Sequence, residues 1–156
     1  VLEMSRSRIG ALIVFERSTG LRSYVETGTI IRGRVSKDLL VTIFYSQNPL
    51  HDGAVIIRNK TVEAARCILP ISTSMRLSPH LGLRHRSAVG LTEQTDAFVV
   101  VVSEETGRIS VATLGNLIAN VDEKQLREYL NDALLPQTAA AGDLSTSEVE
   151  AASFQA

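Results

Sequence analysis

Long apolar runs are missing from this 156-residue sequence, and no stretch approaches the ~20 residues that are needed to cross a bilayer. No charged segment followed by an apolar one opens the chain, so we expect a soluble domain as the sequence stands. Cysteine is almost absent: Cys67 is the single one, which excludes an internal disulfide and fits a reducing compartment. Because Cys67 lies in the apolar-leaning run 64–69, we interpret it as a small buried side chain rather than a reactive thiol.

An excess of positive charge is also missing. The 16 Lys and Arg stand against 17 Asp and Glu, which gives a net charge of -1. This excludes a global positive field of the kind that holds a nucleic-acid polymer. Any anionic ligand must therefore be bound locally.

Several common site motifs are absent as well. The sequence has no GxxxxGK(S/T) phosphate loop, no GxGxxG after a predicted strand and no pair of histidines at zinc spacing. It also lacks a serine or cysteine nucleophile with a matching base. If the chain is an enzyme, metal-assisted displacement at phosphorus is the favoured chemistry.

Apolar residues make up 44% of the chain, which is enough to form one hydrophobic core at this length. We expect one domain over residues 1–136, with its core in 9–112. Residues 137–156 are rich in Ala, Ser and Thr and are predicted to be disordered. Residues 1–8 resemble the last turns of a helix that enters the domain, which predicts a preceding segment in a longer protein.

Periodicity and turn residues predict alternating strands and helices. Residues 9–16 are apolar on both faces and should form a central strand. Further strands are expected at 29–31, 54–58, 61–69, 97–103 and 108–112. Helices are expected at 37–45, after a Ser36 cap, and at 84–93. A third should run from the capping box of Asp122 and Gln125 to Leu134. A further short helical stretch should open at Ser78 and be interrupted at Gly82.

The two predicted hairpins, 54–69 and 97–112, are antiparallel. Helices nevertheless alternate with strands along the chain, as in folds whose sheet is covered on both sides. We therefore expect an α/β (α+β) fold with a mixed central sheet flanked by helices on both faces.

Three polar clusters follow or precede apolar elements, and each has a structural as well as a functional interpretation. In 50–54 (LHDGA), Asp-Gly is an ordinary turn dipeptide, but a carboxylate beside an imidazole at a strand start also suits Mg²⁺ or Mn²⁺. In 82–86 (GLRHR), the basic residues either face water or join a helix N-terminus in binding phosphate through a fork of two arginines. In 103–107 (SEETG), the carboxylates of a β-turn either face water or complete a metal–triphosphate site.

Together, the segments 49–57 (PLHDGAVII), 82–91 (GLRHRSAVGL) and 101–110 (VVSEETGRIS) closely resemble the diadenylate cyclase family. Its two diagnostic signatures, DGA and RHR, are Asp52-Gly53-Ala54 and Arg84-His85-Arg86 in this chain. The resemblance covers about 9–111 and is strongest to the membrane-anchored cyclases. It implies condensation of two ATP into cyclic di-AMP, with release of pyrophosphate, by two domains that meet face to face.

Roles for single residues follow from the resemblance. It implies that Asp52 binds the catalytic metal, Mg²⁺ or Mn²⁺ with Co²⁺ as a further candidate, and promotes deprotonation of the ribose 3′-hydroxyl. His51 and Glu105 are the further metal ligands. The remaining substrate contacts are Gly53, Ala54, Arg84, His85, Arg86, Ser103, Glu104 and, at the adenine edge, the Leu69 backbone.

Two positions depart from the family pattern, since relatives often have Thr where this chain has Leu83 and an aromatic residue where it has Ile68. Loss of an aromatic stack is expected to weaken ATP binding about tenfold or more. A nucleotide sensor without turnover is therefore the alternative function, and a metal-dependent phosphohydrolase is a poorer third reading. The resemblance also implies a cytoplasmic domain anchored at a bacterial membrane through an N-terminal segment, while a regulatory partner is not identified by the sequence.

Overall fold

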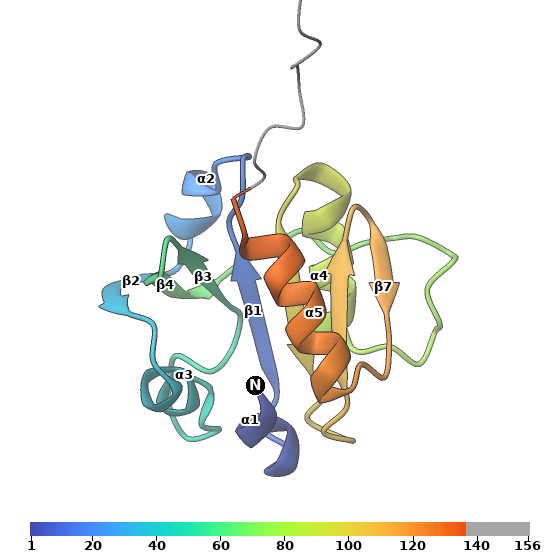
Figure 1. Ribbon diagram of the computed structural model, residues 1–156, viewed down its shortest axis with the longest axis horizontal. Helices are drawn as coiled ribbons and strands as arrows, with labels where there is room; N and C mark the ends of the chain where they lie inside the picture. Colours follow the sequence, from blue (N-terminus) through green and yellow to red (C-terminus); the bar gives the residue numbers. More distant parts are fainter. Residues whose placement is uncertain (137–156) are drawn as a thin grey trace, which may run out of the picture.

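The computed structural model describes residues 1–136, so the predicted disorder of 137–156 lies outside the described part of the chain. Seven strands form one mixed sheet in the order β2-β4-β3-β1-β5-β6-β7 (Figure 1). The strands are β1 (Ala11–Phe15), β2 (Thr29–Arg34), β3 (Ala54–Arg58), β4 (Thr61–Cys67), β5 (Phe98–Val102), β6 (Ile109–Thr113) and β7 (Asn116–Ile118). The helices are α1 (Leu2–Arg6), α2 (Arg22–Val25), α3 (Lys37–Phe44), α4 (Leu83–Gln94) and α5 (Glu123–Leu134).

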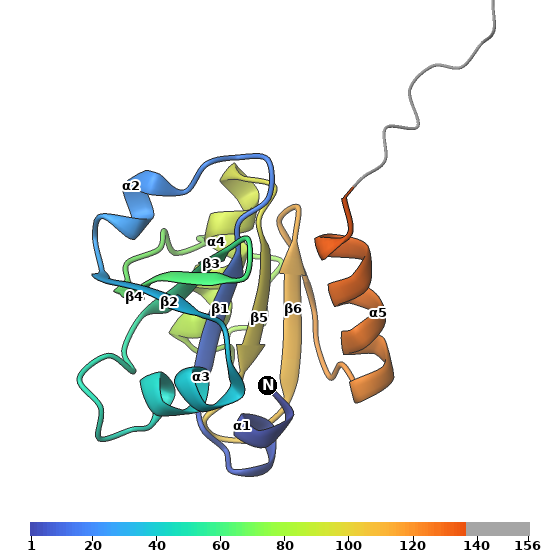
Figure 2. The same ribbon diagram turned by 60° about the vertical axis from the view of Figure 1, so that its left-hand side comes forward.

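The sheet is covered on both faces, which confirms the predicted architecture. One core layer packs α1, α3 and α5 on the sheet through Met4, Phe44 and Leu126. The other core layer packs α2 and α4 through side chains such as Val89 and Leu91. Figure 2 shows α4 and α5 on opposite sides of β5 and β6.

The predicted central strand is confirmed. β1 pairs in parallel with β3 and antiparallel with β5, and its first four residues are buried. A strand with neighbours on both edges and helices on both faces is apolar throughout, because none of its side chains meets water. The Ser36 cap of α3 and the capping box of α5 are also present as predicted.

The helical stretch predicted to open at Ser78 is wrong. Residues 78–81 form only a turn, in which the Leu81 N–H donates to the Ser78 carbonyl, and α4 begins after its N-cap Gly82. α2 and β7 were not predicted from the sequence, and β2 extends three residues beyond its predicted end at residue 31. No helix within residues 1–136 has the length and apolar character to span a membrane.

Candidate active site

The strand register brings the three polar clusters to one end of the sheet. β1 and β3 run in parallel and start at this end, whereas the antiparallel strands β4 and β5 finish there. We call it the motif end, because Asp52 and Gly53 precede β3, Ser103 and Glu104 follow β5, and Leu69 follows β4. The joint position of these clusters could be inferred only once the strand order was known.

Arg84 connects two of the clusters directly. Its Nη1 donates to Oε2 of Glu104 over 3.1 Å, so the first turn of α4 is tied to the end of β5. The guanidinium also lies against the backbone of Gly10, where a Cβ atom would come within 2.8 Å of Cζ and Nη1. Gly10 therefore belongs to the site, although no motif in the sequence indicated it.

The Nε atom of Arg84 is buried and has no hydrogen-bond partner among residues 1–136. Buried polar groups are nearly always paired, so an unpaired guanidinium nitrogen indicates a missing acceptor. Arg84 itself is the second residue of α4, whose N-cap, Gly82, offers no side-chain cap. Free backbone N–H groups and an arginine together favour an anion such as phosphate.

His85 and Arg86 occupy different surroundings from Arg84. Burial, and secondarily the charge of Arg84, lowers the pKa of His85. Arg86 donates from Nη2 to the Ser78 carbonyl over 3.3 Å. Residues two apart on a helix do not face the same side, so the two arginines do not form the expected common fork in this structure.

The Asp52 side chain is exposed before β3, and His51 is half-buried beside it. Nδ1 of His51 lies 2.7 Å from the Asn48 carbonyl, which leaves Nε2 for another partner. Gly53 has a φ of 99°, and a Cβ there would meet the Cys67 carbonyl at 2.8 Å. The glycine is therefore required by the β4 backbone itself, a reason separate from the expected approach of a ligand.

Within residues 1–136, no three His, Cys, Asp or Glu side chains are grouped closely enough to form a metal site. The side chains of His51, Asp52 and Glu105 therefore do not form a preorganised metal site with three protein ligands. Glu105 is exposed on the β5–β6 turn. Mg²⁺ is commonly held by one or two carboxylates together with substrate phosphates and water. Asp52 fits that kind of site, in which the nucleotide supplies further ligands.

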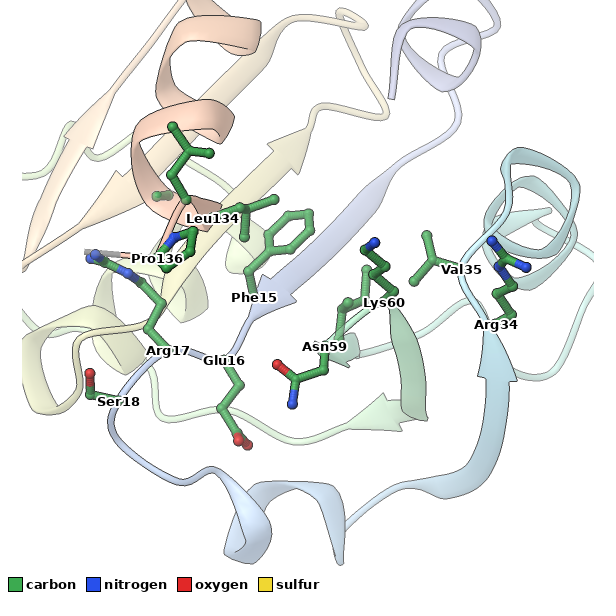
Figure 3. Close-up of a pocket in the computed structure, with 13 residues that line it drawn as sticks. Phe15, Glu16, Arg17, Ser18, Arg34, Val35, Asn59, Lys60, Leu134 and Pro136 are labelled. Carbon is green, nitrogen blue, oxygen red and sulfur yellow. The ribbon is translucent and has the colours of Figure 1, made fainter. Parts of the chain in front are cut away.

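The largest cavity described lies at the opposite end of the sheet from the motif end. It encloses about 980 Å³ between the ends of β1 and β3, the β3–β4 turn and the last turn of α5. Figure 3 shows Phe15 between Leu134 and Lys60 in this cavity. None of the predicted site residues lines it, so cavity size does not identify the site suggested by the motifs.

Comparison with known proteins identifies the family of this chain. The family model described as "DisA bacterial checkpoint controller nucleotide-binding" (DAC) matches residues 1–117. The chain therefore belongs to the DAC family of diadenylate cyclase domains.

Among its relatives, the cyclic di-AMP synthase CdaA of Bacillus subtilis is 50% identical over 127 residues, which are 81% of this chain and 46% of that protein. A diadenylate cyclase of Listeria monocytogenes is 46% identical over 136 residues, covering 87% of this chain and 50% of the relative. The chain thus spans about half the length of these relatives.

Solved structures of bacterial proteins share the fold, and two of them show how close the similarity is. The crystal structure of a double mutant of DacA from Staphylococcus aureus has a TM-score of 0.85 and 46% identity, and the match covers 86% of this chain and 90% of that one. A hypothetical membrane spanning protein from Bacillus cereus has a TM-score of 0.73 and 47% identity, with 76% and 58% covered.

Proposed function

We propose that this domain is a diadenylate cyclase, which condenses two ATP molecules into cyclic di-AMP and releases two pyrophosphates. The observation that carries the proposal is the buried, unpaired Nε of Arg84 at the motif end, beside Gly10 and Glu104. A triphosphate oxygen would supply the acceptor that this nitrogen lacks. Membership of the DAC family and the names of the relatives support the same activity.

In this proposal, Arg84 and His85 hold the triphosphate at the first turn of α4, with Arg86 next to them. Asp52 holds a divalent cation, Mg²⁺, Mn²⁺ or Co²⁺, with His51 and Glu105 as further ligands. The remaining substrate contacts come from Ser103, Glu104, Gly53 and Ala54, and the Leu69 backbone contacts the adenine edge. When bound, the cation supplies positive charge that stabilises the attacking and leaving oxygens.

Each of the two reaction steps forms a bond between a ribose 3′-oxygen and an α-phosphorus. The bond from that phosphorus to the β-phosphate oxygen breaks, pyrophosphate leaves, and the hydroxyl proton is lost beside Asp52. Holding two ATP molecules in opposite orientations makes the encounter effectively intramolecular. The product has two-fold symmetry, so we propose that two domains meet face to face through their motif ends.

The experiment that tests the activity is incubation with ATP and Mn²⁺ or Mg²⁺, followed by chromatography of the nucleotides. Formation of cyclic di-AMP is the expected result. Bound but unchanged ATP would instead favour a nucleotide sensor, the alternative suggested by Ile68 and Leu83, each 70% exposed. Release of ADP or AMP would indicate a phosphohydrolase.

We also propose that the full-length protein is anchored at the bacterial membrane, with this domain in the cytoplasm. The proposal is supported by the description of the Bacillus cereus relative as membrane spanning and by the partial coverage of the relatives. Fractionation of the native protein would test it, because an anchored protein sediments with membranes and requires detergent for release.

A further inference from the structure

Residues 68–72 cross directly over α4, and we call them the strap. The contact is closest at Gly90, in the third turn of the helix, where a Cβ atom would come within 2.1 Å of the Pro70 carbonyl oxygen and 2.8 Å of the Ser72 nitrogen. Glycine weakens a helix interior, so its presence there is explained by this approach of backbone to backbone. Helix and strap are thus packed without any intervening side chain.

Two hydrogen bonds hold the strap in that place. The Ser72 N–H donates to the Arg86 carbonyl over 3.0 Å, and the Ser72 hydroxyl donates to Oε1 of Glu93 over 2.7 Å. Ser72 is 3% exposed and is one of three buried polar side chains within residues 1–136. At the other end of the strap, the Ile68 N–H donates to Oγ1 of Thr27 over 2.9 Å.

Leu69 lies between these two attachment points. Its side chain is buried, while in the described part of the chain its backbone N–H and C=O make no hydrogen bond. The same helix that holds Ser72 carries Arg84 in its first turn. The distance between the Leu69 backbone and the Arg84 guanidinium is therefore set by α4.

We propose that Ser72 and Glu93 are positioning residues that determine base selectivity. They hold the strap on α4, and they thereby fix the free Leu69 backbone edge, which reads the base, relative to Arg84, which holds the phosphates. This inference rests on the proposed function, because it assumes that ATP lies between Leu69 and Arg84. Neither residue is expected to touch the nucleotide.

The test compares ATP with inosine triphosphate, in which a carbonyl replaces the amino group that a backbone edge would recognise. Ser72→Ala and Glu93→Ala are each expected to raise KM for ATP about fivefold while kcat stays within about twofold. The preference for ATP over inosine triphosphate should fall by a similar factor, because a displaced edge no longer discriminates. Since both changes remove one shared bond, the double variant should lose little more than either single variant.

Two control variants accompany these changes. Glu93→Gln keeps an acceptor for the Ser72 hydroxyl and should retain the wild-type preference. Glu128→Ala removes an exposed acid from α5, far from the strap, and should change nothing. If Ser72→Ala does not fold, Glu93→Ala remains usable, because the Glu93 side chain is exposed and its loss leaves the core intact.

An unchanged KM and an unchanged ATP preference in folded Glu93→Ala would overturn the proposal. An equal loss of kcat/KM for both nucleotides would also overturn it, because that pattern indicates general loosening of the fold. If the wild-type domain makes no cyclic di-AMP, the proposed function fails. The selectivity proposal is then decided by calorimetric affinities for the two nucleotides, and equal discrimination by wild type and variants rejects it.

Discussion

At the scale of single residues, Arg84 joins a helix start to two strand ends. Among residues 1–136, one guanidinium nitrogen is paired with Glu104 and another is buried without a partner, and the group lies next to Gly10. A lysine would not reproduce this arrangement, because its ammonium group is a single point charge, whereas the planar guanidinium carries several N–H donors in fixed directions. The residue is therefore suited to receive one oxygen of a ligand while it remains anchored by a carboxylate.

Asp52→Asn tests the proposed cation-binding part of the site. We expect turnover to be nearly abolished and ATP binding to stay within about tenfold of wild type, because an amide is a poor ligand for a divalent cation and cannot favour loss of the hydroxyl proton. Product formation and calorimetric ATP affinity measure the two effects separately. Asp132→Asn, an exposed position on α5, is the matched control, and wild-type rates in Asp52→Asn would remove this carboxylate from the mechanism.

The lowered pKa of His85 predicts a pH dependence of folding. Above the ordinary histidine pKa of about 6.5 the ring is neutral in both states and contributes nothing. As the pH falls below that value, the unfolded chain takes up a proton before the folded one does, so the free energy of unfolding decreases.

Urea unfolding at a series of pH values measures this decrease, and His85→Gln should reduce it. His80→Gln, at an exposed loop position, is the control and should leave the decrease in place. An identical pH dependence in wild type and His85→Gln would contradict the assignment.

At the scale of elements, the close contact between the start of β1 and the first turn of α4 gives a sharp prediction. Gly10→Ala places a methyl group where the Arg84 guanidinium now lies and 3.0 Å from Cβ of Glu104, which must shift slightly. The flexible end of the arginine can move away at little cost to the fold, but it then leaves the position proposed for phosphate. We expect ATP affinity to fall about tenfold or more, the equivalent of one charge-assisted hydrogen bond, with a small change in Tm.

Gly20→Ala is the matched control for this substitution, because nothing lies within 4 Å of a Cβ at Gly20. It should leave both affinity and Tm close to wild type. A large fall in Tm with unchanged affinity in Gly10→Ala would mean that Gly10 serves the fold alone.

The elements that the sequence predicted well are those with a strong local signal. β5 is a run of β-branched residues after Phe98, and α5 has a complete capping box. The four-residue α2 and the three-residue β7 are too short for a hydrophobic period. Gly115, which has a φ of 77° in the turn before β7, was the one usable signal for that strand. Ser78-Pro79 matched a helix start in composition, but only one turn forms there.

In the site, too, the residues that belong to local motifs were predicted from the sequence, and those that act through tertiary contacts were not. The motifs indicated Asp52, Arg84 and Glu104. The role of Gly10 depends on the Arg84 guanidinium that lies against it, and that of Ser72 on its hydrogen bonds to α4. Those contacts join segments that are distant in sequence, and they are decided by strand order rather than by composition.

At the scale of the whole molecule, one domain presents one motif end, whereas the proposed product needs two α-phosphates and two ribose hydroxyls. We expect specific activity to rise with enzyme concentration over about a hundredfold dilution series, because a weak pair dissociates when dilute. Cyclic di-AMP per mole of enzyme at saturating ATP and metal is the measurement, and a dimerising tag should restore activity at low concentration. Constant specific activity from a species that light scattering shows to be monomeric would contradict the paired mechanism.

The way in which α1 is attached has a practical consequence for handling the protein. Ser5 donates from Oγ to the Gly107 carbonyl over 2.6 Å, and Gly107 belongs to the turn that follows Glu105 at the motif end. The chain therefore enters the domain beside the proposed catalytic face, whereas the last turn of α5 lines the cavity at the far end. A sensor chip or bead coupled through the first residues would crowd that face and hinder pairing, while coupling through the end of α5 would leave it open to a second copy.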